Sequence, residues 1–152
     1  MGRWSSAMPA KNIRLVKTPI VAIVDDDEAV REALSDLLMV MEVACRTFDR
    51  AEAFMAEYMP GHFDCLITDV AMPGMSGLEL QERLRELDSS MPVIIITADT
   101  SQATRVRALS GGAHACLTKP VSDEVLFRHL ESALNRAGGS RDGDRRGAPS
   151  DE

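Results

Sequence analysis

The chain has 152 residues, of which 45% are hydrophobic and 27% are charged, a composition typical of one folded globular domain. No apolar run approaches the roughly 20 residues that cross a bilayer, which excludes a membrane-spanning protein. Residues 1–17 also lack the apolar stretch of a secretory signal, so we expect a cytoplasmic protein. Its cysteines, odd in number and each beside apolar residues, favour buried thiols over a disulfide framework or a zinc site: Cys45, Cys65 and Cys116.

The net charge of −7 is distributed unevenly along the chain. Residues 1–18 hold four basic residues and no acid, whereas residues 19–137 hold 10 lysines and arginines against 20 aspartates and glutamates. Nucleic-acid backbones require a basic surface, so we expect no direct nucleic-acid binding. An acidic body of this kind suits a basic partner or a bound divalent cation.

Both ends of the chain have the composition of tails. Residues 1–18 show no sustained hydrophobic period and are predicted to form a flexible basic segment. Residues 138–152 are rich in glycine, arginine and aspartate, and they cannot bury enough apolar area to offset their ordering entropy. We therefore place a single domain at residues 19–137.

Within this domain, apolar runs alternate with segments of helical period. Since strict alternation requires crossover connections, it predicts a parallel sheet covered by helices on both faces, a doubly wound α/β fold. Asp27 is a plausible cap for the first helix. The predicted strands are Ile20–Val24, Val43–Phe48, Cys65–Thr68, Val93–Thr97 and Ala115–Thr118, and the predicted helices are Glu28–Met41, Ala51–Met59, Gly77–Leu87, Ala103–Ser110 and Asp123–Arg136.

Polar side chains follow four of the predicted strands at their carboxyl ends, which converge on one edge of a parallel sheet. The first strand is followed by Asp25, Asp26 and Asp27, and the other three strand ends carry Asp69, Thr97 and Lys119. Ligands of doubly wound sheets bind at this edge. We therefore expect several carboxylates, one hydroxyl and one ammonium in a single crevice.

Clustered carboxylates repel one another and stay ionised only when a cation joins them. Lys119 supplies one positive charge, which is too little for three carboxylates. Mg²⁺ fits such a set of oxygen ligands and leaves room for a phosphoryl oxygen. Beside the cation, one aspartate can attack phosphorus, with Thr97 and Lys119 around the phosphoryl oxygens. The residues thus predict a metal-dependent aspartyl-phosphate site.

Four motifs in order, each at the end of the appropriate strand, resemble the receiver domain of bacterial two-component response regulators, the CheY-like family. They are Val21–Asp26, Thr68–Leu78, Ile96–Ala98 and Lys119-Pro120. The resemblance covers about residues 19–137. It implies a flavodoxin-like (βα)5 fold with strand order 2-1-3-4-5 and a cis bond between Lys119 and Pro120.

The resemblance also assigns roles to individual residues. Asp69 matches the phosphoacceptor, Thr97 the switch hydroxyl and Lys119 the lysine that pairs with the phosphoryl group. Asp26 matches a direct Mg²⁺ ligand, with Asp25 beside it. The resemblance completes the metal site with Asp69 and the carbonyl of Ala71.

Two positions depart from the family pattern. Cys116 occupies the second switch position, where an aromatic residue usually turns inward, so the coupling of phosphorylation to the outer face is open here. Glu42 stands where a glycine often ends the first helix, and a positive φ there costs on the order of 1 kcal/mol.

The leading interpretation is a single-domain response regulator, a signalling switch that catalyses only its own phosphorylation and dephosphorylation. A sensor histidine kinase or phosphotransfer protein donates the phosphoryl group to Asp69. The fourth helix, fifth strand and fifth helix then change their binding of a downstream protein or of a second copy. This interpretation leaves open that the chain is an excerpt of a regulator with an output domain.

Two alternatives remain at the level of sequence. One is a pseudo-receiver, a binding module that works without phosphate, for which Cys116 is the main argument. The other is a phosphatase of the haloacid-dehalogenase type, which also uses strand-end aspartate, threonine or serine, and lysine. That family places its nucleophile after the first strand in an Asp-x-Asp-x-Thr/Val motif, and here Ala29 stands in the last place.

Overall fold

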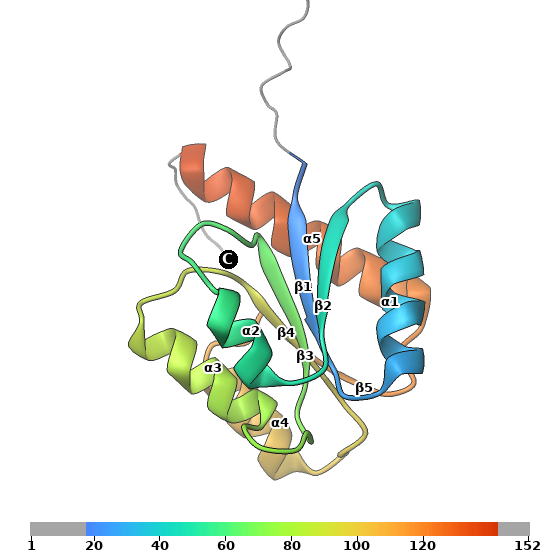
Figure 1. Cartoon of the computed structure of the whole chain (residues 1–152), viewed down its shortest axis with the longest axis vertical. Helices are drawn as coiled ribbons and strands as arrows, with labels where there is room; N and C mark the ends of the chain where they lie inside the picture. Colours follow the sequence, from blue (N-terminus) through green and yellow to red (C-terminus); the bar gives the residue numbers. More distant parts are fainter. Residues whose placement is uncertain (1–17, 143–152) are drawn as a thin grey trace, which may run out of the picture.

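The computed structural model describes residues 18–142 and contains five strands and five helices in strict alternation (Figure 1). The predicted order of elements is therefore confirmed. The strands are β1 (Ile20–Val24), β2 (Ala44–Phe48), β3 (Cys65–Asp69), β4 (Val93–Thr97) and β5 (Ala115–Thr118), and the helices are α1 (Glu28–Val40), α2 (Ala51–Glu57), α3 (Gly77–Glu86), α4 (Gln102–Ser110) and α5 (Asp123–Asp142).

The strands form one parallel sheet in the order β2-β1-β3-β4-β5. The chain winds outward from β1 to β2, and then returns to β3 and continues in the opposite direction. This is the doubly wound α/β fold that the sequence predicted, with the strand order implied by the resemblance. All carboxyl ends meet at one edge of the sheet, the lower edge in Figure 1.

Two helical layers cover the sheet. Helices α1 and α5 pack on one face, where their leucines join Val21, Ile23, Ile67 and Ile94 in one buried cluster. Helices α2, α3 and α4 pack on the other face around Phe54 and a second buried cluster. Strands β3 and β4 are buried at every residue, as expected for central strands covered on both faces.

Helix α5 continues beyond its expected end at Arg136 and reaches Asp142. The tail predicted at residues 138–152 thus begins within this longer helix, and its residues 143–152 lie outside the described residues, as do residues 1–17. Adding a residue to an existing helix gains a hydrogen bond without repeating the cost of nucleation, so even two glycines can follow a packed helix. Within residues 18–142, no helix is both long and apolar enough to cross a membrane.

The three cysteines are free thiols that differ in burial. Cys65 and Cys116 are buried as predicted, and burial raises the pKa of Cys65 to about 12. Cys45 is only half-buried, because β2 is an edge strand that lacks a neighbour on its outer side. The prediction of three buried thiols was wrong at this position.

Helices α1 and α4 end with the same backbone pattern, a Schellman turn whose last residue has a positive φ. In α4, Gly112 takes this conformation at φ +97°, and Ala113 N donates to Ala108 O. In α1, Glu42 takes it at φ +61°, and Val43 N donates to Leu38 O. Glu42 therefore carries the backbone cost that a glycine would avoid.

We predict that Glu42→Gly stabilises the fold by about 0.5–1 kcal/mol, because glycine adopts a left-handed backbone conformation without steric strain. Urea unfolding measures the difference. Glu32→Gly, in the middle of α1, serves as the control and is expected to destabilise by about 1 kcal/mol. A loss of stability in Glu42→Gly would contradict the argument.

Candidate functional site

The pairing of the strands brings the predicted site residues together. Val24 on β1 pairs with Thr68 on β3, so Asp25 and Asp69 follow at the same level of the sheet. Asp69 pairs with Ile96 on β4, and Thr97 is the next residue of that strand. Thr97 pairs with Thr118 on β5, so Lys119 follows immediately. Four strands thereby deliver these polar residues to one edge.

Lys119 joins two of the carboxylates directly. Its Nζ donates to Asp25 Oδ2 at 3.0 Å and to Asp69 Oδ2 at 3.1 Å, and the chain separation is 94 and 50 residues respectively. Asp25 is fully buried and Asp69 is 7% exposed, so water screens these contacts weakly. The bridge therefore fixes the relative position of β1, β3 and the end of β5.

The electrostatics of the crevice shift the pKa of both partners. Burial raises the pKa of Asp69, the hydrogen bond from Lys119 opposes this shift, and the neighbouring charge of Asp25 adds to it. Burial alone would lower the pKa of Lys119, but its hydrogen bonds to Asp25 and Asp69 outweigh burial and raise it. Lys119 is therefore a stable cation, whereas Asp69 carries its negative charge at a cost.

A third carboxylate completes the acidic cluster. Asp26 is exposed, and one oxygen of each of Asp25, Asp26 and Asp69 lies within 4.8 Å of the other two. Lys119 is the only cation that contacts any of them among the ion pairs of residues 18–142. Three clustered carboxylates beside one ammonium leave negative charge uncompensated. Carboxylate oxygens are also the ligands that Mg²⁺ prefers. The residues present thus fit a divalent cation.

Thr97 lies buried at the rim of the same crevice. Its hydroxyl oxygen accepts a hydrogen bond from Asp99 N at 3.0 Å, which leaves the hydroxyl proton available as a donor. The backbone of Lys119 is tied to Thr97 as well, because Lys119 N donates to Thr97 O at 2.8 Å. The peptide bond between Lys119 and Pro120 is cis, as the resemblance implied.

Cys116, the second predicted switch residue, is buried on β5, and burial raises the pKa of its thiol. Arg105 of α4 donates to the carbonyl oxygen of Cys116 at 2.9 Å. The thiol therefore belongs to the core. The hydrogen bond that joins α4 to β5 here is accepted by the main-chain carbonyl of Cys116 and not by its side chain.

The loop that follows Asp69 is held closely against the strand. Gly77 N, at the start of α3, donates to Val70 O at 2.9 Å, and a Cβ atom on Gly77 would lie 1.9 Å from the carbonyl oxygen of Asp69. Ala71, whose carbonyl the resemblance assigns to the metal, is exposed within this loop. The same loop contacts Glu52 of α2, which the sequence analysis missed because the contact spans 23 residues and belongs to no motif.

The parallel sheet and its acidic crevice define the chain as a receiver-type α/β protein, and comparisons with known proteins agree. The family model described as the response regulator receiver domain matches residues 21–131. The response regulator protein TodT of Pseudomonas putida is 34% identical over 142 residues, which cover 89% of this chain and 63% of TodT.

Solved structures give the same result. The response regulator StyR superposes with a TM-score of 0.77 at 38% identity, over 83% of this chain and 64% of StyR. A CheY-like receiver domain protein from Methanospirillum hungatei superposes with a TM-score of 0.76 at 26% identity, over 84% of this chain and all of that one.

This chain belongs to the response regulator receiver domain family. It spans less than two thirds of the length of TodT and StyR, so the activities of those whole proteins do not transfer to it directly.

We predict that Asp69→Asn raises the stability of the metal-free protein at neutral pH by on the order of 1 kcal/mol, because the raised pKa of Asp69 makes its ionisation unfavourable in the folded state. The sign follows from linkage. The free-energy cost of ionising Asp69 in the folded protein is present above the pKa that Asp69 has in the unfolded chain. It disappears as the pH falls and the folded protein binds the proton. Thermal unfolding between pH 4 and pH 7 tests it, with Asp36→Asn on the exposed face of α1 as control. Equal gains at all pH values would contradict the electrostatic cause.

We also predict that millimolar Mg²⁺ raises the melting temperature of the wild-type chain, because a ligand that binds only the folded state stabilises it by mass action. Asp26→Asn is expected to lose most of this increase, since it removes the negative charge of one of the three clustered carboxylates. Asp36→Asn is expected to keep it. An increase that survives in Asp26→Asn would place the cation elsewhere.

Proposed function

We propose that this chain is a phosphorylation-dependent signalling switch that accepts a phosphoryl group on Asp69 from a histidine kinase or a phosphotransfer protein. The observation that carries this proposal is the bridge from Lys119 Nζ to Asp25 and Asp69, next to a third carboxylate. Membership of the receiver family supports it.

In the proposed step, a carboxylate oxygen of Asp69 attacks the phosphorus of a phosphohistidine on the donor. The O–P bond forms as the P–N bond breaks, and the electron pair returns to the imidazole, which takes up a proton. Hydrolysis reverses the switch, because water attacks the acyl phosphate and releases inorganic phosphate and the free carboxylate. In both reactions the group that is modified and regenerated is the chain's own aspartate, so the protein is a switch and not a metabolic enzyme.

The neighbouring residues act on the phosphoryl oxygens. Lys119 already contacts Asp69, and its ammonium can follow the negative charge onto the new phosphoryl group. Thr97 has a hydroxyl proton that can be donated in the same crevice. The metal site would consist of Asp25, Asp26, Asp69 and the carbonyl of Ala71. A bound Mg²⁺ supplies charge neutralisation for the carboxylates and the phosphoryl oxygens.

We propose that α4, β5 and α5 form the face that changes its partner, either a downstream protein or a second copy. Exposed apolar side chains support this choice: Val106 and Leu109 on α4 are 50% and 43% exposed, and Phe127 on α5 is 42% exposed. The hydrogen bond from the Arg105 side chain to the carbonyl oxygen of Cys116 joins α4 to β5. We expect the switch to work in the bacterial cytoplasm and to bind neither nucleic acid nor membrane.

We predict that incubation with acetyl phosphate and Mg²⁺ adds the mass of one phosphoryl group to the wild-type chain, because the small donor supplies the same phosphoryl group without a kinase. Intact mass spectrometry reads this gain. Asp69→Asn is expected to gain nothing, whereas Asp64→Asn, an aspartate outside the crevice, is expected to behave as wild type.

The same assay separates the alternatives. No gain in the wild-type chain would favour a binding module that works without phosphate. Release of many phosphates per chain from added phosphate esters would favour a phosphatase.

We predict that Thr97→Ala still accepts the phosphoryl group but loses the response of α4, because Asp69 and Lys119 remain while the hydroxyl that can turn toward the phosphate is gone. Hydrogen exchange of α4 amides, before and after phosphorylation, measures this response. Thr97→Ser keeps the hydroxyl and is expected to respond as wild type. An unaltered response in Thr97→Ala would remove Thr97 from the switch.

A further inference from the structure

The β3–α3 loop, residues 70–76, joins the proposed phosphoacceptor to helix α3. It follows Asp69 directly and contains Ala71, whose carbonyl is a proposed metal ligand. The shape of this loop therefore sets the distance between that carbonyl and the carboxylates of the crevice. The contacts that hold the loop in shape therefore also affect the geometry of the site.

Both ends of the loop are fixed by local hydrogen bonds. At its start, Val70 N donates to Asp69 Oδ1 at 2.7 Å. At its end, Ser76 and Glu79 form a capping box in which each side chain accepts from the other residue's backbone, at 3.1 and 2.8 Å. These contacts are sequence-local, so they do not fix the middle of the loop against the rest of the domain.

The middle of the loop is anchored by one side chain of α2. Met75 N donates to Glu52 Oε2 at 2.8 Å. Among the hydrogen bonds of residues 18–142, this one alone joins residues 71–75 to another part of the chain. It crosses 23 residues of sequence and ties α2 to the loop that leads into α3.

Gly74 gives independent evidence that the carboxylate lies directly against the loop backbone. Its φ is +78°, and a Cβ atom at this position would lie 2.5 Å from Glu52 Oε2. The loop therefore approaches Glu52 so closely that a side chain at residue 74 would displace the carboxylate. The same hydrogen bond from Met75 lowers the pKa of Glu52, so the side chain is ionised at neutral pH.

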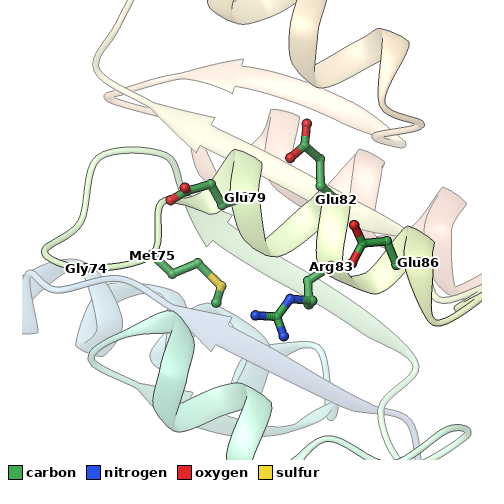
Figure 2. A pocket seen from close by; sticks show the side chains of 6 residues that line it. All are labelled: Gly74, Met75, Glu79, Glu82, Arg83 and Glu86. Carbon is green, nitrogen blue, oxygen red and sulfur yellow. The ribbon is translucent and has the colours of Figure 1, made fainter.

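A pocket of about 360 Å³ lies beside the loop and is lined by Gly74, Met75 and four side chains of α3, Glu79, Glu82, Arg83 and Glu86 (Figure 2). The side chains of Met75 and Arg83 point toward one another across this space. Among the hydrogen bonds of the described residues, none joins Glu82, Arg83 or Glu86 to the loop, and Glu79 accepts only at the loop's last residue, Ser76. Support for the loop backbone at residues 74 and 75 therefore comes from α2.

We propose that Glu52 is a positioning residue of the phosphorylation site: its carboxylate holds the β3–α3 loop at Met75 and thereby sets the loop conformation that presents the carbonyl of Ala71 to the metal. This inference rests on the proposed function for what the loop presents, whereas the anchoring of the loop stands on its own. Among the hydrogen bonds of the described residues, Glu52 bonds the loop backbone and none of the proposed metal ligands, so it acts through the loop.

The test compares Glu52→Ala, Glu52→Gln and the wild-type chain by two measurements that need no phosphorylation. Hydrogen exchange of the Met75 amide is expected to become about fivefold faster in Glu52→Ala, because the amide loses a charged acceptor. The Mg²⁺ dissociation constant, from calorimetric titration, is expected to rise at least about threefold. Glu52→Gln retains an acceptor oxygen and is expected to restore most of both values.

Glu57→Ala is the matched control, since Glu57 lies on the same helix and pairs with Arg46 instead of the loop. It is expected to match the wild type in both measurements. Unchanged amide exchange or unchanged Mg²⁺ affinity in Glu52→Ala would overturn the proposal, and so would a failure of Glu52→Gln to rescue. If the wild-type chain binds no Mg²⁺ and accepts no phosphoryl group, the proposed function fails, while the Met75 amide still reports whether Glu52 anchors the loop.

Discussion

The contact of one ammonium with two buried carboxylates is the interaction on which the rest of the site depends. Lys119 reaches Asp25 and Asp69 across 94 and 50 residues of chain, and only the strand order makes that approach possible. Removing charged groups from water is costly unless they are paired, so the crevice is stable only while the three strand ends stay together. Fold and chemistry therefore constrain each other: the sheet assembles the charges, and the position of each strand end decides how well they are paired.

The fold was largely predictable because its signals are local and repeat along the sequence. Continuous apolar runs mark β3 and β4, which are buried along their whole length, and the alternation with helices leaves a parallel sheet as the main solution. The site followed from one further rule, that parallel strands end at a common edge. This rule brought Asp25, Asp69 and Lys119 together without any knowledge of their side-chain contacts, although the roles of these residues came from the family resemblance.

The features that the sequence did not reveal depend on contacts between distant segments or on small energy differences. Glu52 belongs to no motif, and its hydrogen bond to Met75 exists only because α2 and the β3–α3 loop pack side by side. The end of α5 was misplaced because glycine disfavours a helix by only about 1 kcal/mol per residue, which an established helix can absorb. Cys45 looked like a core residue from its neighbours, but strand order places it at the edge.

The close packing of Gly77 against β3 limits how the residues around the start of α3 can vary. A Cβ atom at this position would lie 1.9 Å from the carbonyl oxygen of Asp69, so the first turn of α3 rests directly on the main chain of β3. Any side chain at position 77 would force the first turn of α3 away from β3, so this position is restricted to glycine while the contact is kept. The loop before it carries a second restriction at Gly74, where a Cβ atom would meet Glu52 Oε2.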